Sequence, residues 1–222
     1  MSCEEFSDAF DALVASYKYS PEYGNDFSSV DLTFDEYEKS VFLTKAQEEI
    51  VLSYYSGNHT DGFEQTEEIR RYLSPLNKTW SYTVNDTSTF IGYEKADFQI
   101  PSDVWFITFE VFNTSKYSKL VIPVNKDELF KTIQNPFKFN SDRYLRIEEG
   151  ENESIIGKNL KGGTYMIYYL RAPYPIILSD LDEMSINGIS SQSCCELHNS
   201  LHYKILDRAV ALAIASKTII QK

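Results

Sequence analysis

The sequence predicts an α+β fold, with a helical core formed by N- and C-terminal helices and an inserted antiparallel β-rich region. Apolar residues recur at helical spacing near both ends of the chain, and they alternate with polar residues between those ends. Sixteen Tyr and fourteen Phe among 222 residues also suit the pleated, half-buried surface of a sheet. We therefore expect residues 1–76 and 190–222 to form the helical core and residues 77–189 the inserted region.

Three helices are predicted before the β-rich region. The first spans residues 4–18, where apolar side chains form one stripe. The second begins at Thr33, whose three-residue spacing to Glu36 matches a capping box, and it ends at Gly57, a residue type that commonly terminates helices. A third, shorter helix covers residues 63–73. These segments make up the N-terminal share of the expected core.

Apolar runs, either alternating or continuous, predict the strands of the inserted region. They lie at Thr79–Tyr93 (one or two strands), Val104–Phe112, Lys119–Val124, Arg143–Glu148 and Thr164–Leu170. After the third of these, Asp127–Gln134 predicts one or two helical turns, which Pro136 ends. The prolines at 173 and 175 cannot continue in a central strand, so they mark the return from the sheet to the helices.

The C-terminal helix has a clear start signal. Ser193 and Glu196 have capping-box spacing, and Leu197, Leu201 and Ile205 then fall near one helical face. We expect a helix from about residue 194 to residue 217 that packs against the N-terminal helices.

The charge balance argues against one class of partner. Lys and Arg number 21 and Asp and Glu number 33, which gives a formal net charge of −12. Proteins that hold nucleic acid tightly neutralise its phosphates with Lys and Arg, so this composition disfavours such binding. An acidic surface lining a passage would instead keep DNA from adhering to it. An ordinary acidic protein and a channel lining both fit the charge.

Cysteine usage predicts free thiols in a reducing compartment. Cys194 and Cys195 are adjacent and do not bridge easily, Cys3 is far away in the sequence, and no Cys-x-x-Cys spacing occurs. The N-terminal residues have neither the basic nor the apolar region of a signal peptide. No apolar run reaches the roughly 20 residues that a membrane span needs.

The sequence contains no convincing catalytic or metal-binding motif. His198 and His202 are four residues apart, as zinc ligands on a helix often are, but the residue after the first His is not the Glu of the metalloprotease pattern. A nucleophile at Cys194 or Cys195 needs an activating partner, and the sequence indicates none. The paired carboxylates, such as Glu148 and its neighbour, are interpreted as solvated faces. We predict no catalytic residue, no metal site and no cofactor.

The aromatic residues exceed what a small inserted sheet can readily bury. Tyr and Trp are enriched in protein interfaces, which favours an oligomer, and ordinary sheet packing is an equally acceptable explanation. On the first interpretation, the candidate contacts are Trp80, Tyr82, Trp105, Tyr169, Tyr174, His198, His202 and Tyr203.

Short motifs without a catalytic signature are scattered over the last part of the chain. They are Leu120–Asp127, Asn135–Phe137, Arg143–Ile147, Tyr169–Leu178, Cys195–His198 and Ile205–Val210. Together these motifs resemble virion structural proteins of crAss-like podoviruses, which infect gut Bacteroides-type bacteria. The resemblance covers about residues 100–217, and it departs from the family's pattern at Lys138, where relatives carry a Gly-Pro run.

This resemblance implies a head-to-tail connector or tail-barrel ring protein, a structural component without enzymatic activity. Such proteins carry an inserted β-region on a helical bundle and assemble as rings, often of twelve subunits, beneath the portal. The implied partners are copies of the chain, the portal and neighbouring tail ring proteins, with DNA only passing through the channel during ejection and no membrane. The implied location is the neck or tail of the virion. Two alternatives stay open, a non-virion assembly chaperone and a small phage hydrolase that uses the acidic clusters.

Overall fold

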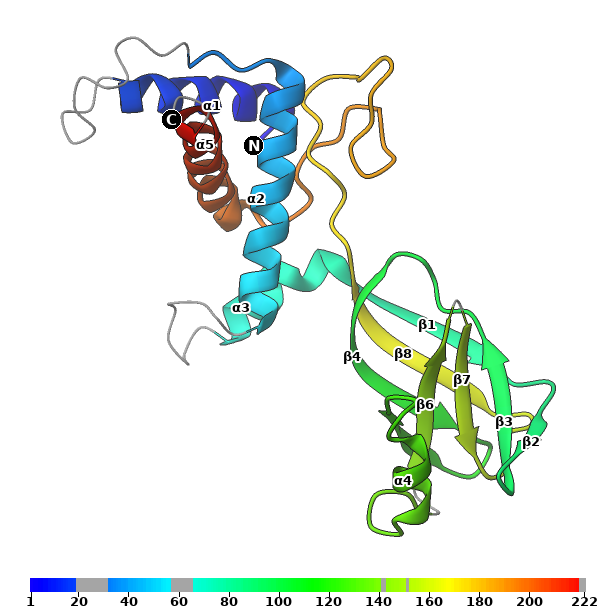
Figure 1. The fold of residues 1–222 in the computed structure, drawn as a ribbon. Helices are drawn as coiled ribbons and strands as arrows, with labels where there is room; N and C mark the ends of the chain where they lie inside the picture. Colours follow the sequence, from blue (N-terminus) through cyan, green and yellow to red (C-terminus); the bar gives the residue numbers. More distant parts are fainter. Residues whose placement is uncertain (19–31, 57–65, 141–142, 151, 220–222) are drawn as a thin grey trace. The chain divides into compact units, whose positions relative to one another are not determined.

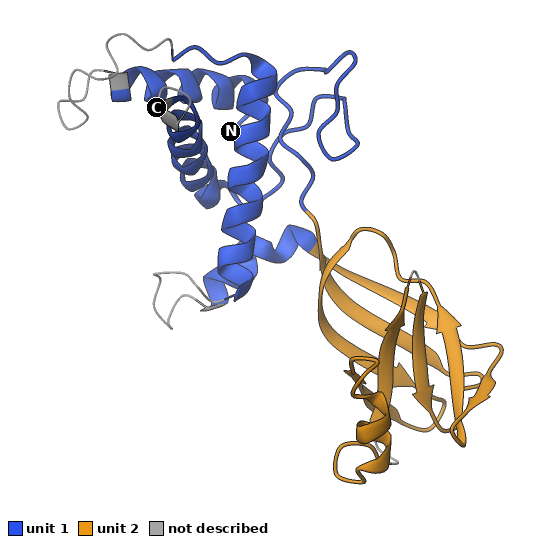
Figure 2. Cartoon of the chain, in the orientation of Figure 1, with its two compact units in different colours: residues 1–76, 173–222 blue, residues 77–172 orange. Residues whose placement is uncertain are grey.

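The structure, a computed structural model, divides into two compact units. It describes residues 1–18, 32–56, 66–140, 143–150 and 152–219. Residues 1–76 with 173–222 form one unit, here called the helical unit, and residues 77–172 form the other, the β unit (Figure 2). The predicted division into folding domains, 1–76 with 190–222 and 77–189, stays a prediction.

The helical unit is built around three helices that pack against one another. Its elements in the described residues are α1 (Cys3–Lys18), α2 (Glu36–Ser56), α3 (Thr66–Leu73), the 3-10 turns η3 (Ser74–Leu76) and η4 (Asn199–Leu201), and α5 (His202–Ile219). Helix α5 packs along α2 and against α1 (Figure 1). Phe6, Phe10, Leu43, Ile205 and Val210 are fully buried between these helices. No helix among the described residues is long and apolar enough to cross a membrane.

Helix α2 begins two residues later than its sequence signal. The capping box is made by Asp35 and Glu38: the Asp35 carboxylate accepts from the Glu38 amide at 2.7 Å, and the Glu38 carboxylate accepts from the Asp35 amide at 3.2 Å. Glu36, the predicted partner of Thr33, instead accepts hydrogen bonds from Ser7 Oγ at 2.8 Å and Lys39 Nζ at 3.0 Å. The predicted stop, Gly57, and the start of the predicted helix at 63–73 lie outside the described residues.

The C-terminal helix begins eight residues later than predicted, at His202. Ser193 is paired with Ile177 through two backbone hydrogen bonds of 2.7 and 3.0 Å. The Glu196 carboxylate accepts from the Tyr174 amide at 2.9 Å. Both residues of the predicted capping box are therefore engaged by a distant segment of the chain. This long-range pairing outweighs the local helix signal.

An extended segment, residues 174–178, is held on α2 by polar side chains of that helix. Ser40 Oγ accepts from the Leu178 amide and Thr44 Oγ1 accepts from the Ile176 amide, both at 3.0 Å. Gln47 Nε2 donates to the Tyr174 carbonyl at 2.8 Å. The three side chains follow the helical repeat and are buried, so α2 satisfies the segment's backbone groups much as a neighbouring strand would.

The prediction of free thiols is wrong for two of the three cysteines. Cys3, the first residue of α1, and Cys194 form a disulfide, with their Cα atoms 5.4 Å apart. Cys195 is free, and its Sγ lies 3.2 Å from the Gln47 side-chain oxygen. Burial raises the pKa of the Cys195 thiol to about 11. The disulfide was not predictable because it depends on a chain fold that places position 194 beside position 3.

The β unit is a single curled sheet. Its strands in the described residues are β1 (Asn77–Thr83), β2 (Ser88–Phe90), β3 (Tyr93–Phe98), β4 (Val104–Asn113), β5 (Ser118–Pro123), β6 (Arg143–Glu149), β7 (Asn152–Gly157) and β8 (Thr164–Arg171). The order across the sheet is β1-β8-β4-β5-β6-β7-β3-β2. The ring of Trp80 in β1 lies 6.1 Å from that of Phe98 in β3. Because five strands separate β1 from β3 in this order, the contact shows that the sheet curls into a half-barrel.

The structure is α+β, but the predicted arrangement of helices and sheet is wrong. The helices are not confined to a core made by the two ends of the chain, because α4 (Leu129–Gln134) belongs to the β unit (Figure 1). The sheet is also mixed instead of antiparallel, since β5 and β6 pair in parallel. A parallel pair requires a crossover connection, and α4 forms part of that connection.

The two faces of the sheet bury different clusters. The inner face holds the larger one, which includes Phe112, Tyr144, Ile155 and Tyr165. On the outer face, α4 and Phe139 cover part of the sheet, with Leu129 packed against Leu145, Ile147 and Ile156. Phe109, Leu120 and Tyr168 belong to β4, β5 and β8 and remain 42–48% exposed. The outer face is thus covered over only part of its width.

Candidate functional site

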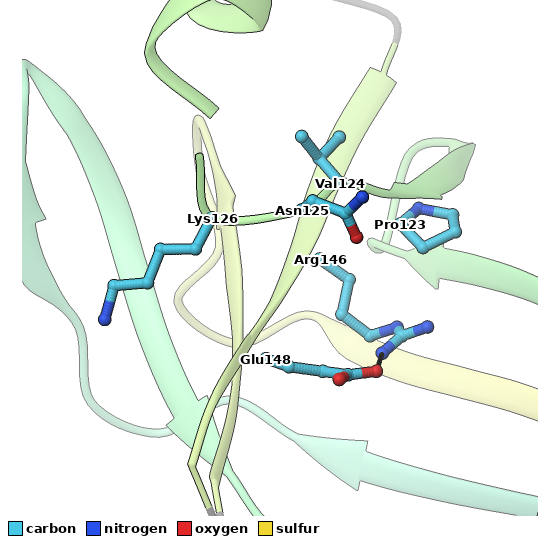
Figure 3. A pocket seen from close by; sticks show the side chains of 6 residues that line it. All are labelled: Pro123, Val124, Asn125, Lys126, Arg146 and Glu148. Carbon is cyan, nitrogen blue, oxygen red and sulfur yellow. Dashed lines mark ion pairs between the residues drawn. The ribbon is translucent and has the colours of Figure 1, made fainter. Parts of the chain in front are cut away.

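Two pockets of the β unit lie at opposite ends of β6. The larger has a volume of about 340 Å³ and is shown in Figure 3. It is lined by Pro123, Val124, Asn125, Lys126, Arg146 and Glu148. The smaller has a volume of about 180 Å³ and is lined by Tyr93, Phe139, Asn140, Arg143, Tyr144 and Lys158. In the larger pocket Arg146 is buried in ion pairs, whereas Arg143 and Lys158 of the smaller pocket are exposed.

In the larger pocket, the Arg146 guanidinium is already bound by carboxylates. Its Nε and Nη2 donate to the two oxygens of Glu110 at 2.9 and 3.2 Å. Its Nη1 donates to Glu153 at 2.8 Å and lies 3.6 Å from Glu148, the ion pair drawn in Figure 3. The Tyr165 hydroxyl adds a hydrogen bond to Glu110 at 2.7 Å. This network joins four strands, β4, β6, β7 and β8, through buried side chains.

The electrostatics of this network fit a structural role. Burial alone would lower the pKa of Arg146, but Glu110 and Glu153 raise it, so the guanidinium stays charged. Burial raises the pKa of Glu153 above its usual range, although Arg146 opposes that shift. The Arg146 guanidinium is therefore the shared ion-pair partner of two buried carboxylates, Glu110 and Glu153. Of the three ionisable residues that line the pocket, Arg146 and Glu148 are paired with each other, and Lys126 lies 3.8 Å from Glu149.

The smaller pocket lies where six basic residues gather at one end of the β unit. They come from the β4–β5 turn, the start of β5, the connection from α4, the start of β6 and the β7–β8 turn. We call this group the basic tip: Lys116, Lys119, Lys138, Arg143, Lys158 and Lys161. All are exposed except Lys119, which is half-buried. The nearby Glu94 carboxylate accepts from the Leu160 amide at 2.6 Å.

Aromatic rings form the walls of this pocket. The rings of Tyr93 and Phe139 have centroids 4.8 Å apart, and Lys158 Nζ lies 5.6 Å from the centre of the Tyr93 ring. Lys119 Nζ lies 5.5 Å from the Tyr144 ring, and the Tyr144 hydroxyl donates to the Lys158 carbonyl at 3.0 Å. Cations beside aromatic faces and open to solvent can bind an acidic partner that also has an apolar group.

The net charge is divided unequally between the two units. The helical unit contains nine Lys and Arg and 21 Asp and Glu, which accounts for the entire formal charge of −12. The β unit contains twelve of each and is neutral overall. The basic tip is therefore a local concentration of positive charge in a chain whose other unit is strongly acidic.

The eight residues predicted as oligomer contacts occupy different environments. In the β unit, Trp80 and Tyr82 pack against the inner cluster, Trp105 is half-buried beside Phe106, and the buried Tyr169 donates to Asp103 at 3.2 Å. In the helical unit, His198 is exposed, and Tyr174 and Tyr203 are 50% and 68% exposed. His202 is buried, with Nε2 3.1 Å from the Leu197 carbonyl. A contact role stays a prediction for all eight, and exposure favours Tyr174, His198 and Tyr203.

Several exposed groups of the β unit were missed in the sequence. Phe137 is 87% exposed and Phe130 is 56% exposed, and Arg143 and Lys158 flank the smaller pocket. Pro136 gave a signal for this region, since it marks a turn and connecting segments run over the protein surface. No group of three or more His, Cys, Asp or Glu that could hold a metal ion occurs among the described residues.

Comparisons with known proteins give one consistent result. A model of the family described as phage tail ring protein 3/4 matches residues 1–222. Ring protein 3 of Bacteroides phage crAss001 is 41% identical over 232 aligned positions, which cover 98% of this chain and 97% of that protein. Ring protein 4/5 of the same phage is 32% identical and is covered over 93% of its length. The similarity spans both units.

Proposed function

The chain belongs to the phage tail ring protein 3/4 family, and from this premise we propose that its copies form a closed ring in the virion tail. The ring is a structural, non-enzymatic component that connects the portal to the tail and surrounds the channel through which the genome leaves. The observation that carries the proposal is the match of the family over the whole chain, with both units included.

We propose twelve copies in the ring, with the portal and further tail ring proteins above and below. A ring arises when one surface of each subunit binds a different surface of the next and the rotation closes. The two units provide chemically distinct surfaces, one acidic and one with a basic end, which supports such head-to-tail contacts.

The helical unit is proposed to line the channel. Its formal charge of −12 repels DNA phosphates, so the genome passes without adhering to the wall. Tight DNA binding would require the opposite charge on the lining surface.

Cryo-electron microscopy of the virion's neck and tail tests the proposal. The expected result is a ring of density below the portal that accepts this chain, with twelve copies and the acidic helices toward the axis. Well-resolved rings that leave no place for the chain would contradict it. So would a chain absent from purified virions, and a lumen formed by the basic residues would contradict the channel arrangement.

A further inference from the structure

We propose that the aromatic pocket at the basic tip binds residues 182–184 of the helical unit of a second copy of this chain. The inference rests on the proposed ring and names one of its contacts. Asp182, Glu183 and Met184 form the donor segment, and Arg143 and Lys158 flank the acceptor pocket.

The pocket selects for an acidic segment with a flexible apolar side chain. Arg143 and Lys158 are exposed at its edge and can form charge-assisted hydrogen bonds with carboxylates. The half-buried Tyr93 supplies an accessible aromatic wall to a volume of about 180 Å³, and the buried Phe139 and Tyr144 line it further in. A thioether makes favourable contacts with aromatic rings and adapts its shape to an irregular pocket.

The donor segment offers this combination on the helical unit. Asp182 and Glu183 are exposed, and Met184 is 49% exposed directly after them. The segment is fixed on both sides: the Leu181 amide donates to the Ser190 carbonyl at 2.7 Å, and Ile186 and Ile189 exchange backbone hydrogen bonds of 2.9 and 3.0 Å. Because its ends are held, little backbone conformational entropy remains to be lost when it binds.

Charge complementarity identifies a second copy as the partner. The donor lies on a unit with a formal charge of −12, and the acceptor gathers six cations on a unit that is neutral overall. Donor and acceptor are different surfaces of one chain, so their contact is heterologous and can propagate around a ring. Salt is expected to weaken this contact, because part of its free energy comes from exposed charges.

Charge reversal in the full-length protein tests the contact. Assembly is measured by native mass spectrometry and sedimentation at several salt concentrations for R143E/K158E, for D182K/E183K, and for the chain that carries all four changes. Each pair alone is expected to raise the dissociation constant between copies about tenfold or more, and the four changes together to restore most of the affinity. The controls are single reversals of the same sign, Lys126→Glu at the opposite end of β6 and Asp207→Lys on the exposed side of α5.

Carbodiimide cross-linking of purified virions provides an independent measurement in the assembled particle. It joins a lysine amine directly to a carboxylate, so the expected product links Lys158 to Asp182 or Glu183. Mixed assembly of isotope-labelled and unlabelled chains shows whether the link joins two copies.

The outcomes separate this contact from the proposed ring. Rings that assemble with wild-type affinity in both reversed variants, or a Lys158 cross-link only to other carboxylates, overturn the contact and leave the ring intact. If R143E/K158E abolishes DNA binding while assembly is unchanged, the tip is a nucleic-acid site and the inference is wrong. Absence of the chain from every ring of the virion contradicts the proposed function itself.

Discussion

The helical unit and the β unit handle charge in opposite ways. In the β unit, acids and bases are equal in number, and Arg146 is buried against Glu110 and Glu153. In the helical unit, acids exceed bases by twelve, and the buried Lys39 is paired with the exposed carboxylates of Asp11 and Glu36. The buried hydroxyls of Ser40 and Thr44 accept hydrogen bonds from the chain's backbone. The difference teaches that the β unit buries acids together with their base, whereas the helical unit keeps the acidic partners of its buried base at the surface and uses neutral side chains to pair buried backbone groups.

The largest effect is expected from breaking the ion network of the β unit. Arg146→Met leaves Glu110 and Glu153 buried without their cation, and loss of one partner from a buried pair costs about 3–5 kcal/mol of unfolding free energy. Urea unfolding followed by circular dichroism measures this loss. Lys126→Met, an exposed neighbour in the same pocket, is the control and is expected to change stability little. Equal unfolding free energies for the two variants would show that the ion network does not stabilise the β unit.

An intermediate effect is expected from the polar residues of α2. Ser40→Ala leaves the buried Leu178 amide without its acceptor, which costs about 1–3 kcal/mol. Ser56→Ala, at the exposed end of the same helix, serves as the control, since among the described residues its hydroxyl bonds to the Ser53 carbonyl of that helix. Differential scanning calorimetry of both variants measures the change. If Ser56→Ala lost as much stability as Ser40→Ala, the loss in Ser40→Ala could not be assigned to the contact between α2 and residues 174–178.

The smallest effect concerns two carboxylates of the β unit whose pKa values shift in opposite directions. A hydrogen bond from Lys95 lowers the pKa of Glu149 despite partial burial, so its stabilising contribution is present above about pH 4.5 and is lost as the pH falls. Burial raises the pKa of Glu153, so its contribution falls as the pH rises above about 4.5.

Unfolding free energies of the wild type, Glu149→Gln and Glu153→Gln between about pH 3 and 7 separate the two groups. Glu149→Gln is expected to lose less stability than the wild type as the pH falls. Glu153→Gln is expected to lose less as the pH rises. Parallel curves for all three proteins would contradict both assignments.

Local sequence patterns predicted individual elements well, and long-range pairing explains most of what they missed. The runs for α1, β4 and α4 lie within one or two residues of the structure. β7 was missed because its burial on both faces removes the alternation that marks a strand. The parallel pairing of β5 with β6 depends on a crossover connection, which no local pattern specifies.

The candidate site was less predictable than the elements. Glu148 was interpreted as part of a solvated face, and it is exposed, but Glu153 on the next strand lies within the ion network. Glu110 is 36 residues from Arg146 in the sequence, so its role depends on the order of strands in the sheet. Trp80 and Tyr82 pack against the inner cluster because the sheet curls around it. Aromatic composition alone does not predict which face of the sheet a residue lies on.

The discontinuity of the helical unit has a consequence for synthesis. The β unit occupies an unbroken stretch of the chain, whereas the helical unit needs residues 173–222 to pack against the first 76 residues. The ribosome makes residues 173–222 after the β unit, so α1 and α2 wait for α5 and for Cys194 while the sheet can already form. The helical unit is therefore completed only after translation has passed α5.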